Sequence, residues 1–477
     1  MNRRNSDKPV SFTIAIIGGG FSGAILASKL LRGGNPAITV VLIEREGCPG
    51  RGVAYSTHLA AHLLNVRAQD MSALANDPSH FLRWAQAHYD DQVHANDYLP
   101  RRVYGKYVES TLCEAMEENP GRFEWKRDEV FSITPAEGGA TIFLKSGSRI
   151  RADAAVLALG NFPPSDPILA RSTEPSRRFV PNPWSVGALD EITPENSVLL
   201  IGSGLTSVDA AISLRSRGFV GKIHMLSRHG LLPQTHKPSG QWPARWDDPA
   251  TRRVRSLLRL IRTEIAKAER QNSDWRSVID SMRPFVQSIW RSLPQQERRR
   301  FLRHLRPYWE VHRHRVAPTI GKLLETEMAQ GRLQIHDGRI IEYREDGDSV
   351  EVRYRKRSSG ESKTLRTDYV INCTGPENDC RKMKSPLLSN LLSRKLVRPD
   401  PLFLGLDTAD DGALLDAHGV PSKFLYTVGP LRKGTLWETT AVPEIGKQVS
   451  ELASHLLSRF ARQWGENLAV KQAAVPA

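Results

Sequence analysis

Apolar runs and helical periodicity follow one another along the chain in an order that predicts two similar units. Residues 12–28, FTIAIIGGGFSGAILAS, are an apolar strand, a glycine turn and an apolar-periodic helix, and the next strand, VVLIE, ends at Glu44. The same order returns at residues 198–214, VLLIGSGLTSVDAAISL, where the next strand, KIHMLS, ends at Ser227. The pattern predicts an α/β protein with two Rossmann-like dinucleotide-binding domains.

The segments around these units follow the same rules. The stretch after Glu44 is loop-rich, and loops of that length are often functional. A closing helix is predicted at about 441–462. The other predicted elements are helices near 78–90 and 102–118, a small antiparallel sheet near 122–150, an arginine-rich helical region at 250–330 and alternating short strands at 331–355.

Three isolated strands decide the domain organisation: AAVLALG at 154–160, DYVINCTG at 368–375 and FLYTVGP at 424–430. The first two end in glycine and fit as late strands of the sheets that the two units begin. We therefore predict that the second dinucleotide-binding domain is inserted in the first. The predicted ranges are 1–190 and 366–477 for an FAD-binding domain, and 191–365 for an NADP-binding domain with a helical insert at 245–330.

The first turn has the spacing G-x-G-x-x-G between a strand and a helix. The first glycine permits the tight turn, the second lets a pyrophosphate approach the backbone, and the third lets helix and strand pack closely. Glu44, at the end of the next strand, can accept hydrogen bonds from ribose hydroxyls and would repel a 2′-phosphate. The predicted contacts of the turn and of the free amides at the helix start are Gly18, Gly20, Phe21, Ser22 and Gly23.

The second turn keeps this spacing with serine in the third position. Where the first unit has Glu44, the second has Arg228, whose guanidinium suits a 2′-phosphate. A solvated surface arginine is the alternative interpretation of Arg228. The predicted contacts are Gly202, Gly204, Leu205, Thr206, Ser207 and Arg228. Two bound dinucleotides imply hydride transfer between them, and the usual pair is NADPH as donor and FAD as acceptor.

Composition limits the other possibilities. The 477 residues exceed one ordinary core, and 40% hydrophobic with 25% charged residues is typical of a soluble globular protein. No run of 18 apolar residues and no signal peptide can be recognised, so the predicted location is cytoplasmic, without a membrane span. Cys48, Cys113, Cys373 and Cys380 form no C-x-x-C pair, which disfavours a disulfide framework, a metal site and thiol–disulfide chemistry. We interpret Cys373 as a small buried residue.

The formal net charge is +15, and four explanations of this charge are possible. The charge could belong to a basic solvated surface, or it could bind anionic small molecules such as nucleotide phosphates, nucleic acid or an acidic membrane surface. The charge alone does not distinguish these explanations. No zinc finger, homeodomain or RNP-type motif accompanies the charge, so a nucleic-acid partner is disfavoured.

These motifs together resemble a known family. The chain resembles the two-dinucleotide-binding flavoproteins, most closely the FAD/NAD(P)-binding proteins of the YdhS-like group, whose wider relatives include N-hydroxylating and Baeyer–Villiger-type monooxygenases. It lacks the WH-type loop of amino-acid N-hydroxylases, so the resemblance does not point to amino-acid substrates. The stretches that carry it are IAIIGGGFSGAILA, GRGVAYSTHLAAHLLNVRAQDMSA, YLPRRVYGKYV, VLALGNFPP, LLIGSGLTSVDAAISL, SRHGLLPQTH, RHLRPYWEVHRHRVAP, VINCTGP and GTLWETTAVPEIGKQ.

The resemblance implies roles for further residues. The loop from Arg51 to Asn65 would lie against the flavin, with Asn65 as a candidate ring contact. The segment Tyr426–Pro430 resembles the late strand whose end meets the flavin ribityl chain. The helix that begins near Val442 would direct its N-terminus at the flavin pyrimidine ring, favouring negative charge there. The implied cofactor contacts are Arg51, Asn65, Gly160, Gly375, Gly429 and Trp437.

The arginine-rich stretch 297–318 has two open interpretations. It is either an amphipathic helix with a solvated basic face, kinked at Pro307, or a source of cations that reach the active-site cleft and bind an anionic substrate or the NADPH phosphates. The positions expected to face a core are Phe301, Leu305 and Tyr308, and those on another face are Arg299, Arg303 and Arg306. The cations of the second interpretation are Arg306, His312, Arg313 and Arg315.

The catalytic candidates are Asn65, His236 and Arg313; a plain structural histidine is the alternative for His236. The leading hypothesis is an FAD- and NADPH-dependent monooxygenase that hydroxylates a small, anionic or amine-bearing substrate with molecular oxygen through a flavin peroxide adduct. A reductase or dehydrogenase without oxygen insertion, and a non-catalytic FAD-binding redox sensor, are the alternatives. The oligomeric state is left open.

Overall fold

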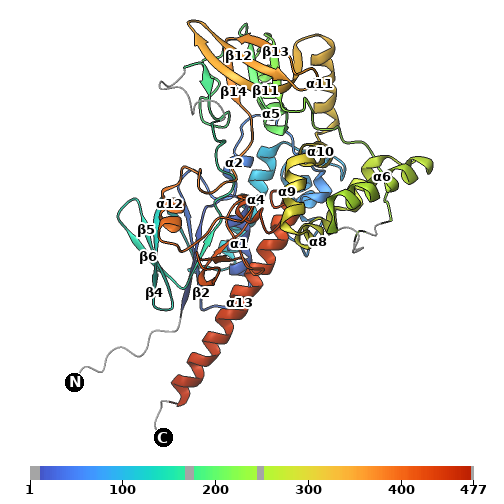
Figure 1. Cartoon of the computed structure of the whole chain (residues 1–477). Coiled ribbons are helices and arrows are strands. Elements are labelled where there is room, and N and C mark those ends of the chain that lie inside the picture. Colours follow the sequence, from blue (N-terminus) through green and yellow to red (C-terminus); the bar gives the residue numbers. More distant parts are fainter. Residues whose placement is uncertain (1–10, 167–176, 244–245, 247–251, 474–477) are drawn as a thin grey trace. The chain divides into compact units, whose positions relative to one another are not determined.

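The computed structural model describes residues 11–166, 177–243, 246 and 252–473 (Figure 1). Its contacts divide the chain into two compact units: unit 1 comprises residues 1–57, 67–161 and 378–477, and unit 2 comprises 58–66 and 162–377. The chain therefore leaves the first unit and returns to complete it. The predicted limits at 190/191 and 365/366 stay predictions about which residues bind which dinucleotide.

A six-stranded sheet forms the core of unit 1, in the order β15-β16-β7-β1-β2-β3. β7, β1, β2, β3 and β16 are parallel, and β15 pairs antiparallel with β16. The strand predicted at 154–160 lies in this sheet as β7, and the segment Tyr426–Pro430, which the resemblance identified as a late strand, begins within β16 of the same sheet. The strands are β1 (Phe12–Ile17), β2 (Ile38–Glu44), β3 (Phe123–Arg127), β7 (Ala154–Leu157), β15 (Ala413–Leu415) and β16 (Pro421–Thr427).

Helix α1 packs on β1 and β2 of this sheet and against α4 and α13. α13 runs beyond the predicted end at residue 462. A separate antiparallel sheet of β4 (Val130–Ala136), β5 (Gly139–Leu144) and β6 (Arg149–Ala152) packs against α12, as the alternation near 122–150 predicted. The helices are α1 (Phe21–Arg32), α2 (Gly52–Tyr55), η1 (Ala68–Asp70), α3 (His80–His88), α4 (Arg101–Glu117), α12 (Pro386–Ser393), η5 (Pro430–Arg432) and α13 (Val442–Ala473).

Unit 2 is built on a seven-stranded sheet in the order β13-β12-β11-β10-β9-β14-β8. β11, β10, β9, β14 and β8 are parallel, and β12 and β13 extend the sheet as antiparallel strands. β11 is one strand of 14 residues rather than the short strands expected there. The strands are β8 (Phe179–Val180), β9 (Val198–Ile201), β10 (Ile223–Ser227), β11 (Leu333–Asp346), β12 (Ser349–Lys356), β13 (Ser362–Thr367) and β14 (Tyr369–Asn372).

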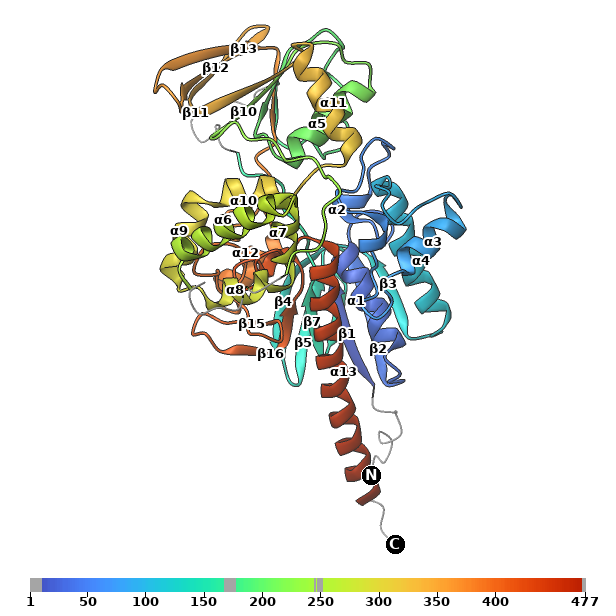
Figure 2. The same cartoon turned by 90° about the vertical axis from the view of Figure 1, so that its right-hand side faces the viewer.

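The predicted helical region lies between β10 and β11, where Figure 2 shows α6 to α10 gathered together. The helix is interrupted just before Pro307: α9 ends at His304 and α10 begins at Arg306. Proline has no backbone N–H, so it cannot donate the hydrogen bond that would continue α9 into α10. The helices of unit 2 are α5 (Leu205–Ser216), α6 (Val254–Arg270), α7 (Trp275–Ser281), η4 (Arg283–Phe285), α8 (Val286–Ser292), α9 (Gln295–His304), α10 (Arg306–Arg313) and α11 (Pro318–Ala329).

Candidate functional site

The glycine turn of unit 1 requires its glycines for steric reasons. Gly18 has φ +105°, and a Cβ on it would overlap the carbonyl oxygen of Ala158. A Cβ on Gly23 would overlap the carbonyl oxygen of Gly18, so the third glycine lets α1 pack directly on the turn. No side chain caps α1 at Gly20, and its first turn carries no acidic residue. The amides of Phe21, Ser22 and Gly23 thus form a helix N-terminus suited to an anion.

Glu44 is held at this turn by backbone amides. Its Oε2 accepts a hydrogen bond from Gly19 N at 2.6 Å, and its Oε1 accepts one from Glu46 N at 3.0 Å. The carboxylate is half-buried at the end of β2. A carboxylate fixed beside the glycine turn suits ribose hydroxyls, as predicted from its position in the sequence.

Arg51 lies beside the same turn but is committed to an acid. Gly50 N donates to Gly19 O at 2.7 Å, and a Cβ on Gly20 would lie 3.4 Å from Gly52 Cα, so this segment packs on the turn. The Arg51 guanidinium pairs with Glu109 of α4 at 2.8 Å. Arg51 therefore anchors the loop to α4. Its guanidinium could contact a cofactor only while it is also paired with Glu109.

The loop after β16 approaches the glycine turn from another part of the sequence. Gly429 has φ +83°, and a Cβ on it would lie 2.9 Å from Ser22 Oγ. Its N–H donates to Gln448 Oε1 in α13 at 3.1 Å. Trp437 is buried in the same loop, with Lys433 Nζ 5.2 Å from its ring centroid. The structure thus brings Gly429 to Ser22, although more than 400 residues separate them in the chain.

Three buried polar atoms of unit 1 test whether these residues fit FAD. Gln448 Nε2, Thr439 Oγ1 and the Tyr104 hydroxyl have no hydrogen-bond partner within the described residues, and all three side chains are at most 1% exposed. Tyr104 packs on Phe21, with ring centroids 6.0 Å apart. Buried donors without partners are costly unless a ligand satisfies them. Together with the glycine cradle, they fit a large polar cofactor, and sequence reasoning had missed all three.

Unit 2 repeats the turn with the same geometry. Gly202 has φ +119°, and a Cβ on it would lie 2.5 Å from Cys373 O; around Gly204 the equivalent space is open. Ser207 is fully buried in the first turn of α5, after Leu205 and Thr206. Burial raises the pKa of the Cys373 thiol to about 12, which agrees with its interpretation as a small packing residue.

Arg228 follows β10 directly and is exposed, as its predicted role requires. The glycine turn and this strand end are linked, because Ser203 Oγ lies 2.7 Å from Ser227 Oγ. Gly160 and Gly375, which follow β7 and β14, both have positive φ, and nothing lies within 4 Å of a Cβ built on either. Both turns leave room for a ligand near the backbone.

Two of the three catalytic candidates are in contact within unit 2. His236 Nε2 lies 3.0 Å from Asn65 O, and since a carbonyl oxygen can only accept, Nε2 carries the proton. Main-chain hydrogen bonds from His236 N to Val316 O and from Gln234 N to Val311 O fix the same segment to the helical insert. Arg313 ends α10 and is half-buried.

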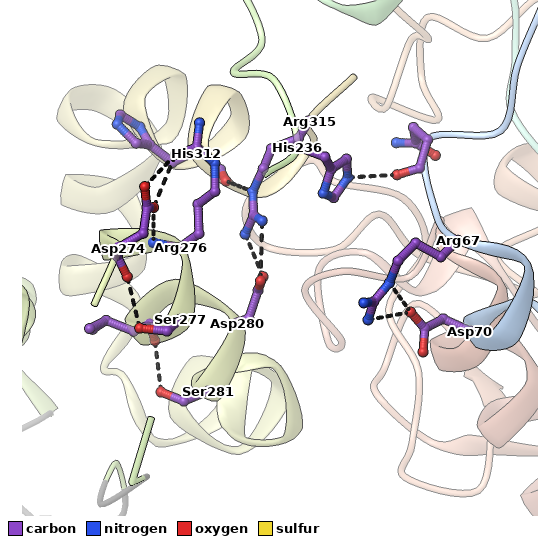
Figure 3. Close-up of polar contacts among 12 residues, drawn as sticks. Arg67, Asp70, His236, Asp274, Arg276, Ser277, Asp280, Ser281, His312 and Arg315 are labelled. Atoms are coloured by element: carbon purple, nitrogen blue, oxygen red, sulfur yellow. Dashed lines mark hydrogen bonds and ion pairs between the residues drawn. The ribbon is translucent and has the colours of Figure 1, made fainter. Parts of the chain in front are cut away.

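Two ion pairs with buried guanidinium groups hold the insert together (Figure 3). Arg315 is 1% exposed and pairs with Asp280, and Arg276 pairs with Asp274 and donates to Thr235 O. Both guanidinium groups lie over the Trp275 ring. The hypothesis that Arg315 reaches a cleft to bind an anion is therefore wrong, because its charge is satisfied internally.

The other predictions for the arginine-rich stretch 297–318 have different outcomes. Arg306 pairs with Glu310, and His312 Nδ1 lies 2.7 Å from Tyr308 O, so neither is an uncommitted cation. Phe301 and Leu305 are half-buried, but Tyr308 is 44% exposed, so the expectation that it faces a core is wrong. The helix break after residue 304 rotates Tyr308 away from the stripe that helical spacing would give it. Arg299 and Arg303 are exposed, as a solvated basic face requires.

Comparison with known proteins supports the fold. Residues 15–162 match a family model described as FAD-NAD(P)-binding, and residues 277–385 match one described as an FAD binding domain. Among curated proteins, none matches the sequence of the chain. The chain thus contains an FAD-NAD(P)-binding domain, in the part where the first glycine turn lies.

Solved structures of similar fold include monooxygenases and also disulfide reductases, among them the Lactococcus lactis thioredoxin reductase, which is 12% identical, with 95% of this chain and 100% of that chain covered and a TM-score of 0.52. The L-lysine 6-monooxygenase from Pseudomonas syringae is 17% identical, with 94% of this chain and 99% of that chain covered and a TM-score of 0.65. The reduced ornithine hydroxylase from Pseudomonas aeruginosa is 15% identical, with 94% and 100% covered and a TM-score of 0.63. The FAD-bound cadaverine monooxygenase from Erwinia amylovora is 12% identical, with 93% of each chain covered and a TM-score of 0.63.

The similarity of these structures, at 12–17% sequence identity, shows the fold of the chain. The predicted fold class, with one dinucleotide-binding domain inserted in the other, and the predicted combination of FAD with NAD(P) are confirmed at this level. Within residues 11–166, 177–243 and 252–473, no three His, Cys, Asp or Glu side chains gather as around a metal ion. No helix in the described part of the chain is long and apolar enough to cross a membrane.

Proposed function

We propose that the chain is an FAD-dependent monooxygenase that takes electrons from NADPH and hydroxylates a small molecule with oxygen. The observation that carries the proposal is the pair of glycine turns. Both follow a parallel strand and open a helix with uncapped amides, but the next strand ends in Glu44 in one unit and is followed by Arg228 in the other. The carboxylate favours a ribose without a 2′-phosphate, and the guanidinium favours one with it.

The residues would have distinct roles. Unit 1 would hold FAD through the turn from Gly18 to Gly23, Glu44 and the orphaned donors near Gly429. Unit 2 would hold NADPH through Gly202, Gly204 and Arg228. His236, Asn65 and Arg313 remain the candidates for contacts with the reacting groups. The N-terminus of α13, close in sequence to Trp437, would favour negative charge on a bound flavin.

FAD, when bound, would supply the redox chemistry, which comprises two-electron transfer from NADPH and activation of oxygen. The overall reaction balances as substrate–H + O2 + NADPH + H⁺ giving substrate–OH + NADP⁺ + H2O. The protein binds, orients and excludes water, and no side-chain nucleophile is required. An amine-bearing substrate is the first class to test, because three proteins of this fold are named for lysine, ornithine and cadaverine.

The test is direct. The purified protein should show flavin absorbance, and under anaerobic conditions NADPH should bleach it faster than NADH does. Admitting air should restore the flavin colour, and one of a panel of small amines should raise NADPH consumption and yield a hydroxylated product by mass spectrometry.

Three results would favour other functions. Reoxidation with no hydroxylated product and quantitative hydrogen peroxide for every amine tested would favour an oxidase. Reduction followed by electron transfer to an added acceptor would favour a reductase or dehydrogenase. Flavin binding without reduction by either nicotinamide would remove both enzymatic proposals and leave a redox-sensing role.

A further inference from the structure

A small cluster of cationic and aromatic side chains lies next to Arg228 in unit 2. β10 and β11 are parallel neighbours, with Ser227 paired to Asp337. Arg357 follows β12, and its N–H donates to Asp337 O at 3.3 Å. A Cβ on Gly230 would lie 3.1 Å from Asp337 Cβ, so the turn after Arg228 packs on the same residue. Arg228 and Arg357 therefore follow the ends of β10 and β12, the two strands that flank β11 on either side of Asp337.

Neither arginine is neutralised by the protein. Both are exposed, and neither forms an ion pair with any part of the chain that the structure describes. The nearby Asp337 carboxylate accepts a hydrogen bond from Ser358 N at 3.2 Å. Two uncommitted guanidinium groups at one strand edge suit a doubly charged phosphate, which each can bind through two parallel hydrogen bonds.

An aromatic surface lies beside these cations. The ring centroids of His229 and Tyr308 are 5.5 Å apart in an edge-to-face arrangement, and Tyr308 is 44% exposed. Burial and the charges of Arg357 and Arg228 lower the pKa of His229, which favours the neutral imidazole. Gly230 N donates to Ser227 Oγ at 3.0 Å and fixes the turn that carries His229. Neutral aromatic rings next to bound phosphate are typical platforms for a purine base.

We propose that Arg228 and Arg357 together hold the 2′-phosphate of NADPH, and that the pair His229–Tyr308 forms the platform for its adenine. Tyr308 comes from α10, so the helical insert takes part in choosing the cofactor. This inference rests on the proposed function, since it takes NADPH as the occupant of unit 2. It also gives a reason for the exposure of Tyr308, which the sequence pattern had assigned to a core.

The test measures binding of adenosine 2′,5′-bisphosphate and adenosine 5′-monophosphate to the FAD-loaded protein by calorimetry. The two probes differ only in the 2′-phosphate and require no flavin reduction. The unaltered protein should bind the bisphosphate at least tenfold more tightly. Arg357→Gln should reduce that preference about tenfold and leave monophosphate binding unchanged. Arg353→Gln is the matched control, since Arg353 lies on β12 and pairs with Glu342; it should change neither value.

The platform has its own pair of variants. Tyr308→Leu should weaken both probes by the same factor, about fivefold, whereas Tyr308→Phe should bind them like the unaltered protein because it keeps the ring. Circular dichroism of each variant establishes that it is folded, and Arg357→Lys, which keeps the charge but not the planar fork, should retain part of the preference.

Each contrary outcome is distinct. Equal affinity for the two probes in the unaltered protein would overturn the phosphate site, whatever the enzyme does. An unchanged preference in Arg357→Gln would remove Arg357, and unchanged binding in Tyr308→Leu would remove the platform. If inorganic phosphate displaces the bisphosphate at equal concentration, the cluster is a general anion site and the assignment fails. Absence of NADPH reduction with intact bisphosphate binding would instead refute the proposed function.

Discussion

Gly429 and Gln448 are joined by a hydrogen bond across the loop between β16 and α13, with Gly429 N 3.1 Å from Gln448 Oε1. The bond orients the side-chain amide so that its Nε2, buried and without a partner in the described residues, is the remaining donor. Gly429 in turn lies against Ser22 in the first turn of α1. A residue of the last helix is thus tied to the turn that the sequence assigned to a pyrophosphate.

Gln448→Met should weaken FAD binding about tenfold, because methionine keeps the volume but donates no hydrogen bond. Loss of the acceptor for Gly429 N should also cost about 1–2 kcal/mol of folding stability. Titration of the flavin-free protein with FAD, followed by flavin fluorescence, measures the affinity. Gln287→Met is the control, since Gln287 Nε2 is also buried without a partner but belongs to α8 of unit 2. An unchanged FAD affinity in Gln448→Met would exclude a cofactor contact.

Gly204→Ala should separate nucleotide binding from folding. Nothing lies within 4 Å of a Cβ at Gly204, and its φ is −85°, which alanine adopts without strain. The unfolding temperature should therefore change by only about 1 °C, while binding of NADPH weakens by about tenfold or more, because the new methyl group would occupy the space of the pyrophosphate. Gly202→Ala, which meets Cys373 O, should instead unfold at a clearly lower temperature. Unaltered NADPH binding in Gly204→Ala would contradict the assigned role of this turn.

Arg228→Ala should raise the apparent KM for NADPH by about tenfold or more and leave that for NADH nearly unchanged, since NADH lacks the 2′-phosphate that the guanidinium would bind. Steady-state kinetics with both cofactors measures the difference. Arg217→Ala is the control, because Arg217 lies at the other end of α5 and pairs with Asp190. Equal effects of Arg228→Ala on both cofactors would show that the arginine is only part of a solvated surface.

Acid should destabilise unit 2 through a pair of histidines. His224 Nδ1 lies 3.1 Å from His336 Nε2. Burial, with the charges of His336 and Lys222, lowers the pKa of His224 to about 4, and burial lowers that of His336 despite the nearby Asp337. In the unfolded chain both would titrate near 6.5, so below that pH the unfolded state takes up protons that the folded state refuses. Stability present above about pH 6.5 is therefore lost as the pH falls towards 4.

The loss in free energy of unfolding should be about 1–2 kcal/mol. This is smaller than the pKa shifts would give at about 1.4 kcal/mol for each pKa unit, because both imidazole rings are partly open to water. Urea unfolding at pH 7.5, 6 and 5 measures it. The double variant His224→Gln with His336→Gln should flatten the pH dependence over this range, and His418→Gln, at an exposed position, should not. The same slope in the double variant would assign the acid sensitivity to other groups.

Local patterns were enough for much of the fold and for half of the site. The strand and helix periods located both glycine turns, and the isolated strands 154–160 and 368–375, each ending in glycine, indicated the split arrangement, because a parallel strand far along the chain can join a sheet begun earlier through a crossover connection. Glu44 and Arg228 could be found because their distance from the turn is set by one helix and one strand. Gln448, Thr439 and Tyr104 could not, since nothing in their local sequence distinguishes them from core residues.

The sequence by itself determined which backbone positions must be glycine and where a helix N-terminus faces a turn, because these depend on neighbours a few residues away. Only the tertiary structure decided which charges are uncommitted. Arg315 and Arg306 look like Arg228 and Arg357 in the sequence, yet the first two are paired with Asp280 and Glu310 while the last two have no acidic partner in the described chain. Pairing depends on which acids long-range packing brings within reach, and residue spacing carries no record of that.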